Sequence, residues 1–184
     1  MSQKRISAES PAPLTRISYW LMPVAEDSDR LAELIGWLAE GFAGPIFAPH
    51  LTVYSGPAAD SDDPALILER ALGPGGEIVL GCTGLSFSDK FTKTCFLTFA
   101  STPRLSRLSE AIRQNLGHPE KYDLKPHLSL LYAKLYGSER QGIREMVELP
   151  EVVRFDSLVA MATSARINSA EDVMSWRILA SHKL

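Results

Sequence analysis

The chain has 184 residues, of which 45% are hydrophobic and 22% are charged, and its formal net charge is −3. A chain of this length buries a sizeable core without disulfides or metals, and the mild acidity argues against long nucleic acid as a partner. No apolar run approaches the roughly 20 residues of a membrane-spanning helix, and the two cysteines, Cys82 and Cys95, are too few for a disulfide scaffold. We expect a cytoplasmic protein, monomeric and without a membrane partner.

The first residues, MSQKRISAESPAPLT (1–15), contain no apolar stretch of the kind found in signal peptides. We expect them to form a flexible arm. Residues 16–184 contain neither a linker nor a low-complexity tract, and they are expected to form a single domain of two lobes that share a core.

The first half of this domain predicts alternating strands and helices. Residues 16–23 are rich in aromatic and β-branched side chains and predict a strand, and apolar residues at helical spacing predict a helix over 26–42. A short strand is expected at 50–56. Asp63 then provides the N-cap of a helix that begins with Pro64 and ends before a glycine.

Two further strands complete the first half, and the second half repeats this plan without the leading strand. Residues 77–100 predict two strands joined near 88–90, a turn that would place Cys82 opposite Cys95. The elements expected after this hairpin are a helix at 103–116 capped by Ser101 or Thr102, a strand at 126–133, a helix at 137–149, and strands at 152–165 and 175–184. The order β-α-β-α-β-β-α-β-α-β-β predicts an α+β fold with a mostly antiparallel sheet.

One short phrase occurs in both halves, as PHLTV and as PHLSL. Residues two apart on a strand leave the same face, so His50 shares a face with Thr52, and His127 shares one with Ser129. If approximate two-fold symmetry relates the halves, the two strands face each other across a groove. Two imidazoles and two hydroxyls would then converge on one site.

This set of groups suits displacement at phosphorus. Histidine titrates near neutral pH, so one ring can activate water while the other protonates the leaving oxygen. Thr52 and Ser129 would donate hydrogen bonds to the non-bridging phosphate oxygens, where charge accumulates in the transition state. No metal or other cofactor is required by this scheme.

Other interpretations of the same residues are less specific. A single His-x-Thr on a strand is usually structural, because histidine can be a hydrogen-bonded core residue and threonine is a common strand residue. Two histidines without a carboxylate or thiolate at ligand spacing are a weak metal signature. A serine or cysteine nucleophile has no supporting motif, since there is no Gly-x-Ser-x-Gly and both cysteines lie in apolar strands.

The paired phrases resemble the His-x-[Thr/Ser]-x motifs of the 2H phosphoesterase superfamily. The segments SYWLMP, CFLTF, TPRL, KPHLSLLYA and SWRILASHKL extend the resemblance to its cyclic phosphodiesterase branch, over nearly the whole chain from Arg16. The resemblance implies a bilobal fold with outer helices and a central cleft. It also implies hydrolysis of ADP-ribose 1″,2″-cyclic phosphate and of nucleoside 2′,3′-cyclic phosphates to nucleoside 2′-phosphates.

The resemblance further implies a role for individual residues. Tyr132 matches a tyrosine that borders the phosphate, a position that requires a bend or bulge after Ser129 if the strand is otherwise regular. The implied assignments are the acid and base to His50 and His127, phosphate contacts to Thr52, Ser129 and Tyr132, and base or ribose contacts to Trp20 and Trp176.

Two alternative functions remain open at this point. One is an enzyme of the same superfamily that acts on RNA ends, as a 2′,3′-cyclic or 2′,5′-phosphodiesterase or ligase, although the acidic net charge weighs against it. The other is a non-catalytic module that binds a nucleotide phosphate, although the two intact histidines and hydroxyls weigh against that.

Overall fold

The computed structural model describes residues 14–118 and 120–184, and within them the expected strands and helices occur in the expected order. Residues 1–13 of the predicted arm lie outside the described residues, whereas residues 14 and 15 belong to the first strand. The strands are β1 (Leu14–Pro23), β2 (Leu51–Pro57), β3 (Ile78–Phe87), β4 (Cys95–Phe99), β5 (His127–Leu131), β6 (Val152–Ser164) and β7 (Arg177–Lys183). The helices are α1 (Ala25–Phe42), α2 (Pro64–Ala71), α3 (Pro103–Asn115), α4 (Gly137–Met146) and α5 (Ala170–Met174), with a 3₁₀ turn at Phe91–Lys93.

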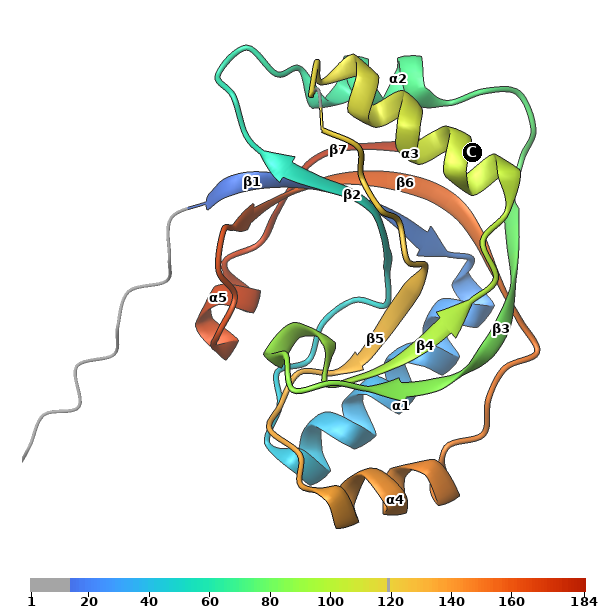
Figure 1. Cartoon of the computed structure of the whole chain (residues 1–184), viewed down its shortest axis with the longest axis vertical. Coiled ribbons are helices and arrows are strands. Elements are labelled where there is room, and N and C mark those ends of the chain that lie inside the picture. Colours follow the sequence, from blue (N-terminus) through green and yellow to red (C-terminus); the bar gives the residue numbers. More distant parts are fainter. Residues whose placement is uncertain (1–13, 119) are drawn as a thin grey trace, which may run out of the picture.

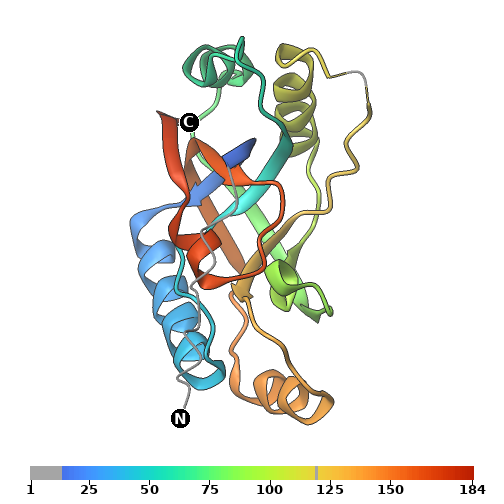
Figure 2. The ribbon, with the colours of Figure 1, turned by 90° about the vertical axis from the view of Figure 1, so that its left-hand side faces the viewer.

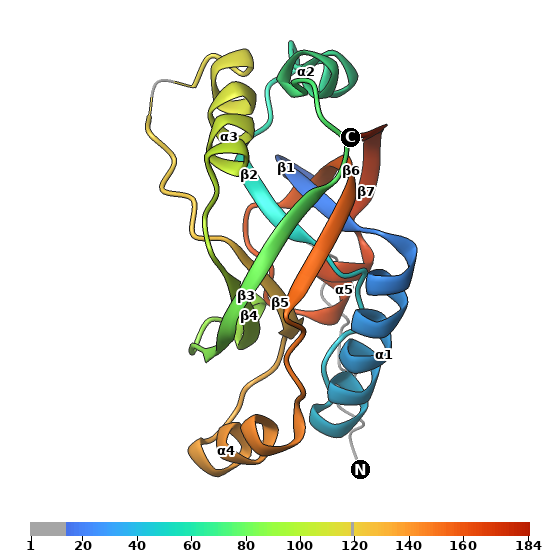
Figure 3. The ribbon, with the colours of Figure 1, turned by 90° about the vertical axis from the view of Figure 1, so that its right-hand side faces the viewer.

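All strands belong to one antiparallel sheet with the order β1-β2-β5-β4-β3-β6-β7. Because β1 also pairs with β6, the first six strands of this order close into a ring of pairings. Figure 3 shows β3 beside β6, where one half of the sheet joins the other. The predicted α+β class is therefore confirmed, and its two lobes are halves of one continuous sheet.

The helices cover the two ends of this sheet (Figures 1 and 2). At one end α2 packs against β6 and β7 and α3 packs against β2, while α1 packs against β1 and β5 toward the other. Helical spacing explains the packing of α1, whose residues Leu31, Ile35 and Leu38 are all buried in the core. Each such side chain contributes roughly 2 kcal/mol when it is fully buried.

Side-chain caps confirm the expected starts of α2 and α3, whereas α1 begins at Ala25 after Val24 and has no side-chain cap, so the expectation of a cap at Asp27 or Ser28 was wrong. The carboxylate of Asp63 accepts a hydrogen bond from the Leu66 N–H over 3.1 Å at the start of α2. At the start of α3, Thr102 is the cap, and its hydroxyl accepts from the Leu105 N–H over 3.2 Å. Each cap satisfies an N–H group that the helix itself leaves without a partner.

The hairpin of β3 and β4 has a longer connection than expected. The 3₁₀ turn at Phe91–Lys93 shifts the centre of the hairpin, so that Cys82 pairs with Phe99 and Cys95 pairs with Phe87. The expectation that the two cysteines lie opposite each other was therefore wrong. Both are free thiols, and burial raises the pKa of Cys95.

Helix α5 is an element that the sequence pattern did not predict. Its N-cap is Ser169, whose hydroxyl accepts from the Asp172 N–H over 3.2 Å. A helix this short carries only one turn of hydrogen bonds, so its stability depends on packing against the sheet. It contacts β6, and Trp176 lies between its end and the first residue of β7.

Candidate active site

One cleft of about 230 Å³ contains both copies of the repeated phrase. His50, Thr52, His127 and Ser129 all line it. The leucines between them, Leu51 and Leu128, leave the opposite face of the strands and are fully buried in the core. The remaining residues of the cleft wall are Ser18, Trp20, Ser55, Thr92, Tyr122, Tyr132, Thr163, Ile167 and Trp176.

The two histidine strands are direct neighbours in the sheet. They are joined by a single residue pair, Leu51 with Leu128. In this antiparallel register the residue before Leu51 is adjacent to the residue after Leu128, so His50 lies beside Ser129. By the same relation Thr52 lies beside His127. The approximate two-fold axis expected from the sequence thus passes through this leucine pair, and each histidine is grouped with the hydroxyl of the other strand.

A β-bulge follows the hydroxyl residue in each strand. Tyr19 pairs with Tyr54 and Trp20 with Thr52, so Val53 is the extra residue of β2. The corresponding irregularity between β4 and β5 makes Leu130 the extra residue of β5. A bulge shifts the alternation of faces by one residue.

The bulges bring two further residues to the cleft. Tyr132 lies three positions after Ser129 and would face the core on a regular strand, yet it lines the cleft. The bulge at Leu130 therefore provides the bend after Ser129 that a Tyr132 side chain in the cleft requires. Ser55 lies three positions after Thr52 and lines the cleft in the same way. Nothing in the sequence analysis singled out Ser55, although applying the offset of Tyr132 to the first phrase would have found it.

Both imidazoles are oriented by the same local hydrogen bond. His50 Nδ1 is 2.7 Å from the carbonyl oxygen of Ala48, and His127 Nδ1 is 2.7 Å from that of Lys125. Because a carbonyl oxygen only accepts, Nδ1 carries the hydrogen and donates it in each ring. Each neutral ring then has an unprotonated Nε2 that is free to accept a proton.

Burial lowers the pKa of both histidines. His50 is 6% exposed, and loss of hydration lowers its pKa to about 4, with a smaller contribution from the charge of His127. His127 is half-buried, and burial followed by the charge of Lys93 lowers its pKa below 6.5. The bonds to the Ala48 and Lys125 carbonyls act in the opposite direction but are outweighed. Both rings are therefore mainly neutral at pH 7 in the free protein.

Aromatic side chains hold the first histidine from one side. Trp20 stacks on His50 with ring centroids 3.7 Å apart and planes at 16°, and Trp20 is 3% exposed. Trp176 meets Trp20 edge-on at 5.0 Å and is half-buried. One face of Trp20 is thus covered by His50, which leaves Trp176 as the more accessible of the two tryptophans in the cleft.

The hydroxyl groups of the cleft differ in their present partners. Thr52 has no hydrogen-bond partner for its hydroxyl within residues 14–118 and 120–184, whereas Ser129 donates to the Thr92 carbonyl over 2.9 Å. The Tyr132 phenol is within hydrogen-bonding reach of Ser129, but burial is the larger influence and raises its pKa. Tyr132 therefore remains protonated and can donate.

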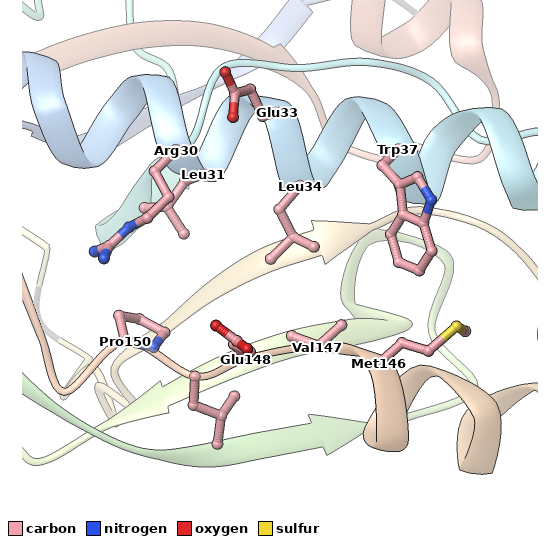
Figure 4. A pocket seen from close by; sticks show the side chains of 10 residues that line it. Arg30, Leu31, Glu33, Leu34, Trp37, Met146, Val147, Glu148 and Pro150 are labelled. Carbon is pink, nitrogen blue, oxygen red and sulfur yellow. The ribbon is translucent and has the colours of Figure 1, made fainter.

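A separate hollow of about 420 Å³ lies between α1 and the segment after α4 (Figure 4). Trp37 and Leu34 face Met146 and Val147 across it, and Arg30 lies at one end. It contains no histidine, cysteine or serine. Within the described residues no group of three or more His, Cys, Asp and Glu could hold a metal ion, and no helix there is long and apolar enough to cross a membrane.

Comparisons with known proteins identify the fold and the family of this chain. Two structures of E. coli LigT, each matched over 92% of this chain, share the fold: the complex with 3′-AMP (98% of that chain, TM-score 0.59, 16% identity) and the apo form (96%, 0.60, 18%). The cyclic phosphodiesterase of Arabidopsis thaliana is 28% identical over 128 residues, which are 70% of this chain and 71% of that protein. A family model described as cyclic phosphodiesterase-like protein matches residues 15–184. The chain therefore belongs to the cyclic phosphodiesterase-like family, the enzyme family within the 2H phosphoesterases that its paired phrases predicted.

Proposed function

We propose that the protein hydrolyses small cyclic phosphate esters, with His50 and His127 as a general acid and base at one phosphorus. The substrates are ADP-ribose 1″,2″-cyclic phosphate, nucleoside 2′,3′-cyclic phosphates, or both. The observation that carries this proposal is the presence of two unprotonated Nε2 atoms, on neighbouring strands, in one cleft with hydroxyl donors.

The reaction balances with these two groups and water. One histidine accepts a proton from water as its oxygen bonds to phosphorus, and the bond from phosphorus to one ribose oxygen breaks. The other histidine, as imidazolium, donates its proton to that oxygen. For a nucleoside 2′,3′-cyclic phosphate that gives a 2′-phosphate, the leaving oxygen is O3′. Solvent then returns the two rings to their starting protonation states.

Three side chains would bind the phosphate. The free hydroxyl of Thr52 and the protonated phenol of Tyr132 can donate to non-bridging oxygens, and Ser129 can do so by releasing the Thr92 carbonyl. A bound phosphate anion would also favour the imidazolium form, which supplies the proton that the free protein lacks at pH 7. Trp176 would flank the ribose or base, and Trp20 would support His50.

The pH dependence of kcat/KM tests the histidine pair. Only the singly protonated pair contains both an acid and a base, and burial has lowered the pKa of His50 to about 4 and that of His127 below 6.5. We expect a bell-shaped profile whose maximum lies below pH 6.5, because above that pH the acid is lost and near pH 4 the base is protonated. Circular dichroism at each pH would exclude unfolding, and a maximum above pH 7 would contradict the scheme.

Chelation provides a second test, because neither the acid nor the base in this scheme is a metal-bound group. We expect activity after dialysis against EDTA to stay within about twofold of the untreated value, since both proton transfers rely on histidine. A tenfold loss that added Zn²⁺ or Mn²⁺ restores would contradict a metal-independent reaction.

A panel of substrates separates this proposal from its alternatives. It would contain ADP-ribose 1″,2″-cyclic phosphate, the four nucleoside 2′,3′-cyclic phosphates, and oligonucleotides with cyclic or 2′,5′-linked ends. We expect turnover of the small esters. Turnover of the oligonucleotides alone would favour an RNA-end enzyme, and binding of cyclic nucleotides without any product would favour a binding module.

A further inference from the structure

The wall of the catalytic cleft contains no lysine or arginine among the residues that the structure describes. Both of its histidines are mainly neutral at pH 7, and its remaining polar side chains are hydroxyls and indoles. A cyclic phosphate ester is an anion, and the charge on its non-bridging oxygens grows during displacement. Neutral donors offset this charge only in part, so a cation just outside the wall would contribute to the reaction.

Lys93 lies on the His127 side of the cleft. Its Nζ is 4.4 Å from the centre of the Phe96 ring, and this ring meets the His127 ring edge-on at 5.5 Å. Phe96 pairs with Ser129 between β4 and β5, so its side chain leaves the same face of the sheet as the Ser129 hydroxyl. One aromatic ring thus separates the Lys93 ammonium group from the imidazole of the second motif.

The 3₁₀ turn that carries Lys93 is anchored on both sides of this residue. The Ser129 hydroxyl donates to the carbonyl of Thr92 over 2.9 Å, and Thr92 itself lines the cleft. The hydroxyl of Thr94, which is 1% exposed, donates to the Ala133 carbonyl over 2.6 Å. The backbone of Lys93 is therefore held at a fixed place beside the cleft.

The charge of Lys93 has no acidic partner in the part of the chain that the structure describes. The side chain is half-buried, and burial, followed by the like charges of Lys90 and Lys125, lowers its pKa. A lysine that is only half-buried still keeps its proton below pH 7. Like charges gathered at one place repel each other and destabilise the fold, a cost that an anion in the adjoining cleft would offset.

The charge of Lys93 also acts on His127. After burial, it is the influence that lowers the pKa of this ring, whereas the bond to the Lys125 carbonyl raises it. The other titratable side chains of the cleft wall are mainly in their neutral forms at pH 7, namely those of His50, Tyr122 and Tyr132. Removal of the Lys93 charge should therefore raise the pKa of His127.

We propose that Lys93 supplies the fixed positive charge of the catalytic site. From its place behind His127 it stabilises the negative oxygens of the bound phosphate, most strongly in the transition state, and it favours the neutral form of this ring in the free protein. Because it acts by its charge and not by contact with the reacting atoms, Lys93 is a positioning residue. The inference rests on the proposed function and adds to it a group outside the cleft wall.

The test compares Lys93→Met with Lys93→Arg in the hydrolysis of adenosine 2′,3′-cyclic phosphate. Methionine keeps an unbranched apolar stem and removes the charge, so we expect kcat to fall roughly 5- to 30-fold and KM to change less. The alkaline limb of the kcat/KM profile should move to higher pH, since the pKa of His127 rises. Lys93→Arg keeps the charge, so kcat should stay within about threefold and the limb should not move.

Lys134→Met is the matched control, because Lys134 is an exposed lysine whose charge is not among those that lower the pKa of His127 or Lys93. Its kcat and pH profile should equal those of the unaltered protein. Thermal unfolding of each variant would show whether the contact with Phe96 is needed for folding. An equal loss of kcat in both Lys93 variants, a loss without movement of the alkaline limb, or unchanged kinetics in Lys93→Met would overturn the inference.

Calorimetry separates failure of this inference from failure of the proposed function. We expect adenosine 2′-phosphate to bind Lys93→Met about 3- to 10-fold more weakly than it binds the unaltered protein, and uncharged adenosine to bind both equally. Equal affinities for the phosphate would overturn the role of Lys93 while the hydrolysis stands. Absence of turnover with every ester would overturn the hydrolysis, and the difference in phosphate binding would still test Lys93.

Discussion

Replacement of His50 or His127 by alanine is expected to lower kcat for a cyclic phosphate ester by about 10²- to 10⁴-fold, because each variant removes one of the two groups proposed to transfer protons. The two losses should not add in the double variant, since one group alone cannot complete the proton transfers. Steady-state kinetics with a 2′,3′-cyclic nucleotide would measure both effects.

The control for these variants is His182→Ala, which removes an exposed histidine on β7 that is absent from the cleft wall. His50 is buried against Trp20, so thermal unfolding of His50→Ala should be recorded to separate lost catalysis from lost folding. If either histidine variant stays within tenfold of the unaltered protein while folded, the two-histidine mechanism is wrong.

Loss of a cleft hydroxyl is expected to have the next largest effect. Thr52→Val keeps the β-branched shape and Ser129→Ala keeps the small size, but each removes one of the donors proposed to bind a charged phosphate oxygen. A hydrogen bond to a charged group is worth about 1.5–3 kcal/mol, so kcat should fall roughly 10- to 100-fold in each variant. Because the charge on these oxygens grows in the transition state, kcat should change more than KM.

Thr83→Val is a matched control, because Thr83 is an exposed threonine of β3 whose hydroxyl donates to Thr98. Its kcat should be unchanged. A rise in KM with constant kcat in Thr52→Val would mean that the hydroxyl binds substrate and transition state equally, which would contradict the assigned role.

The sequence predicted the paired groups because their pattern is local. A separation of two residues on a strand puts His50 on the same face as Thr52, and His127 on the same face as Ser129. A repeated phrase indicates two related strands. The caps of α2 and α3 were predictable for the same reason, since Asp63 and Thr102 act on N–H groups three residues away.

Features that depend on a distant partner were not predictable. The bulge at Leu130 was expected only because the resemblance assigns Tyr132 to the phosphate. The bulge at Val53, which brings Ser55 to the cleft, becomes evident only when β2 is aligned with β1. The hairpin register depended on how the residues between β3 and β4 fold, and the 3₁₀ turn at Phe91–Lys93 moved the cysteines apart. Helix α5 is too short to have a periodic signal of its own.

The single pairing between β2 and β5 has a mechanical consequence. Elsewhere the ring of strands is continuous, with β1 and β6 paired along their length, whereas only Leu51 and Leu128 join the strands of the two histidines. Segments with few backbone hydrogen bonds open at the lowest free-energy cost. The backbone pairing that holds the two imidazoles side by side is therefore the shortest in the ring. We therefore expect the distance between the His50 and His127 rings to vary more in the empty protein than in a complex with a ligand in the cleft.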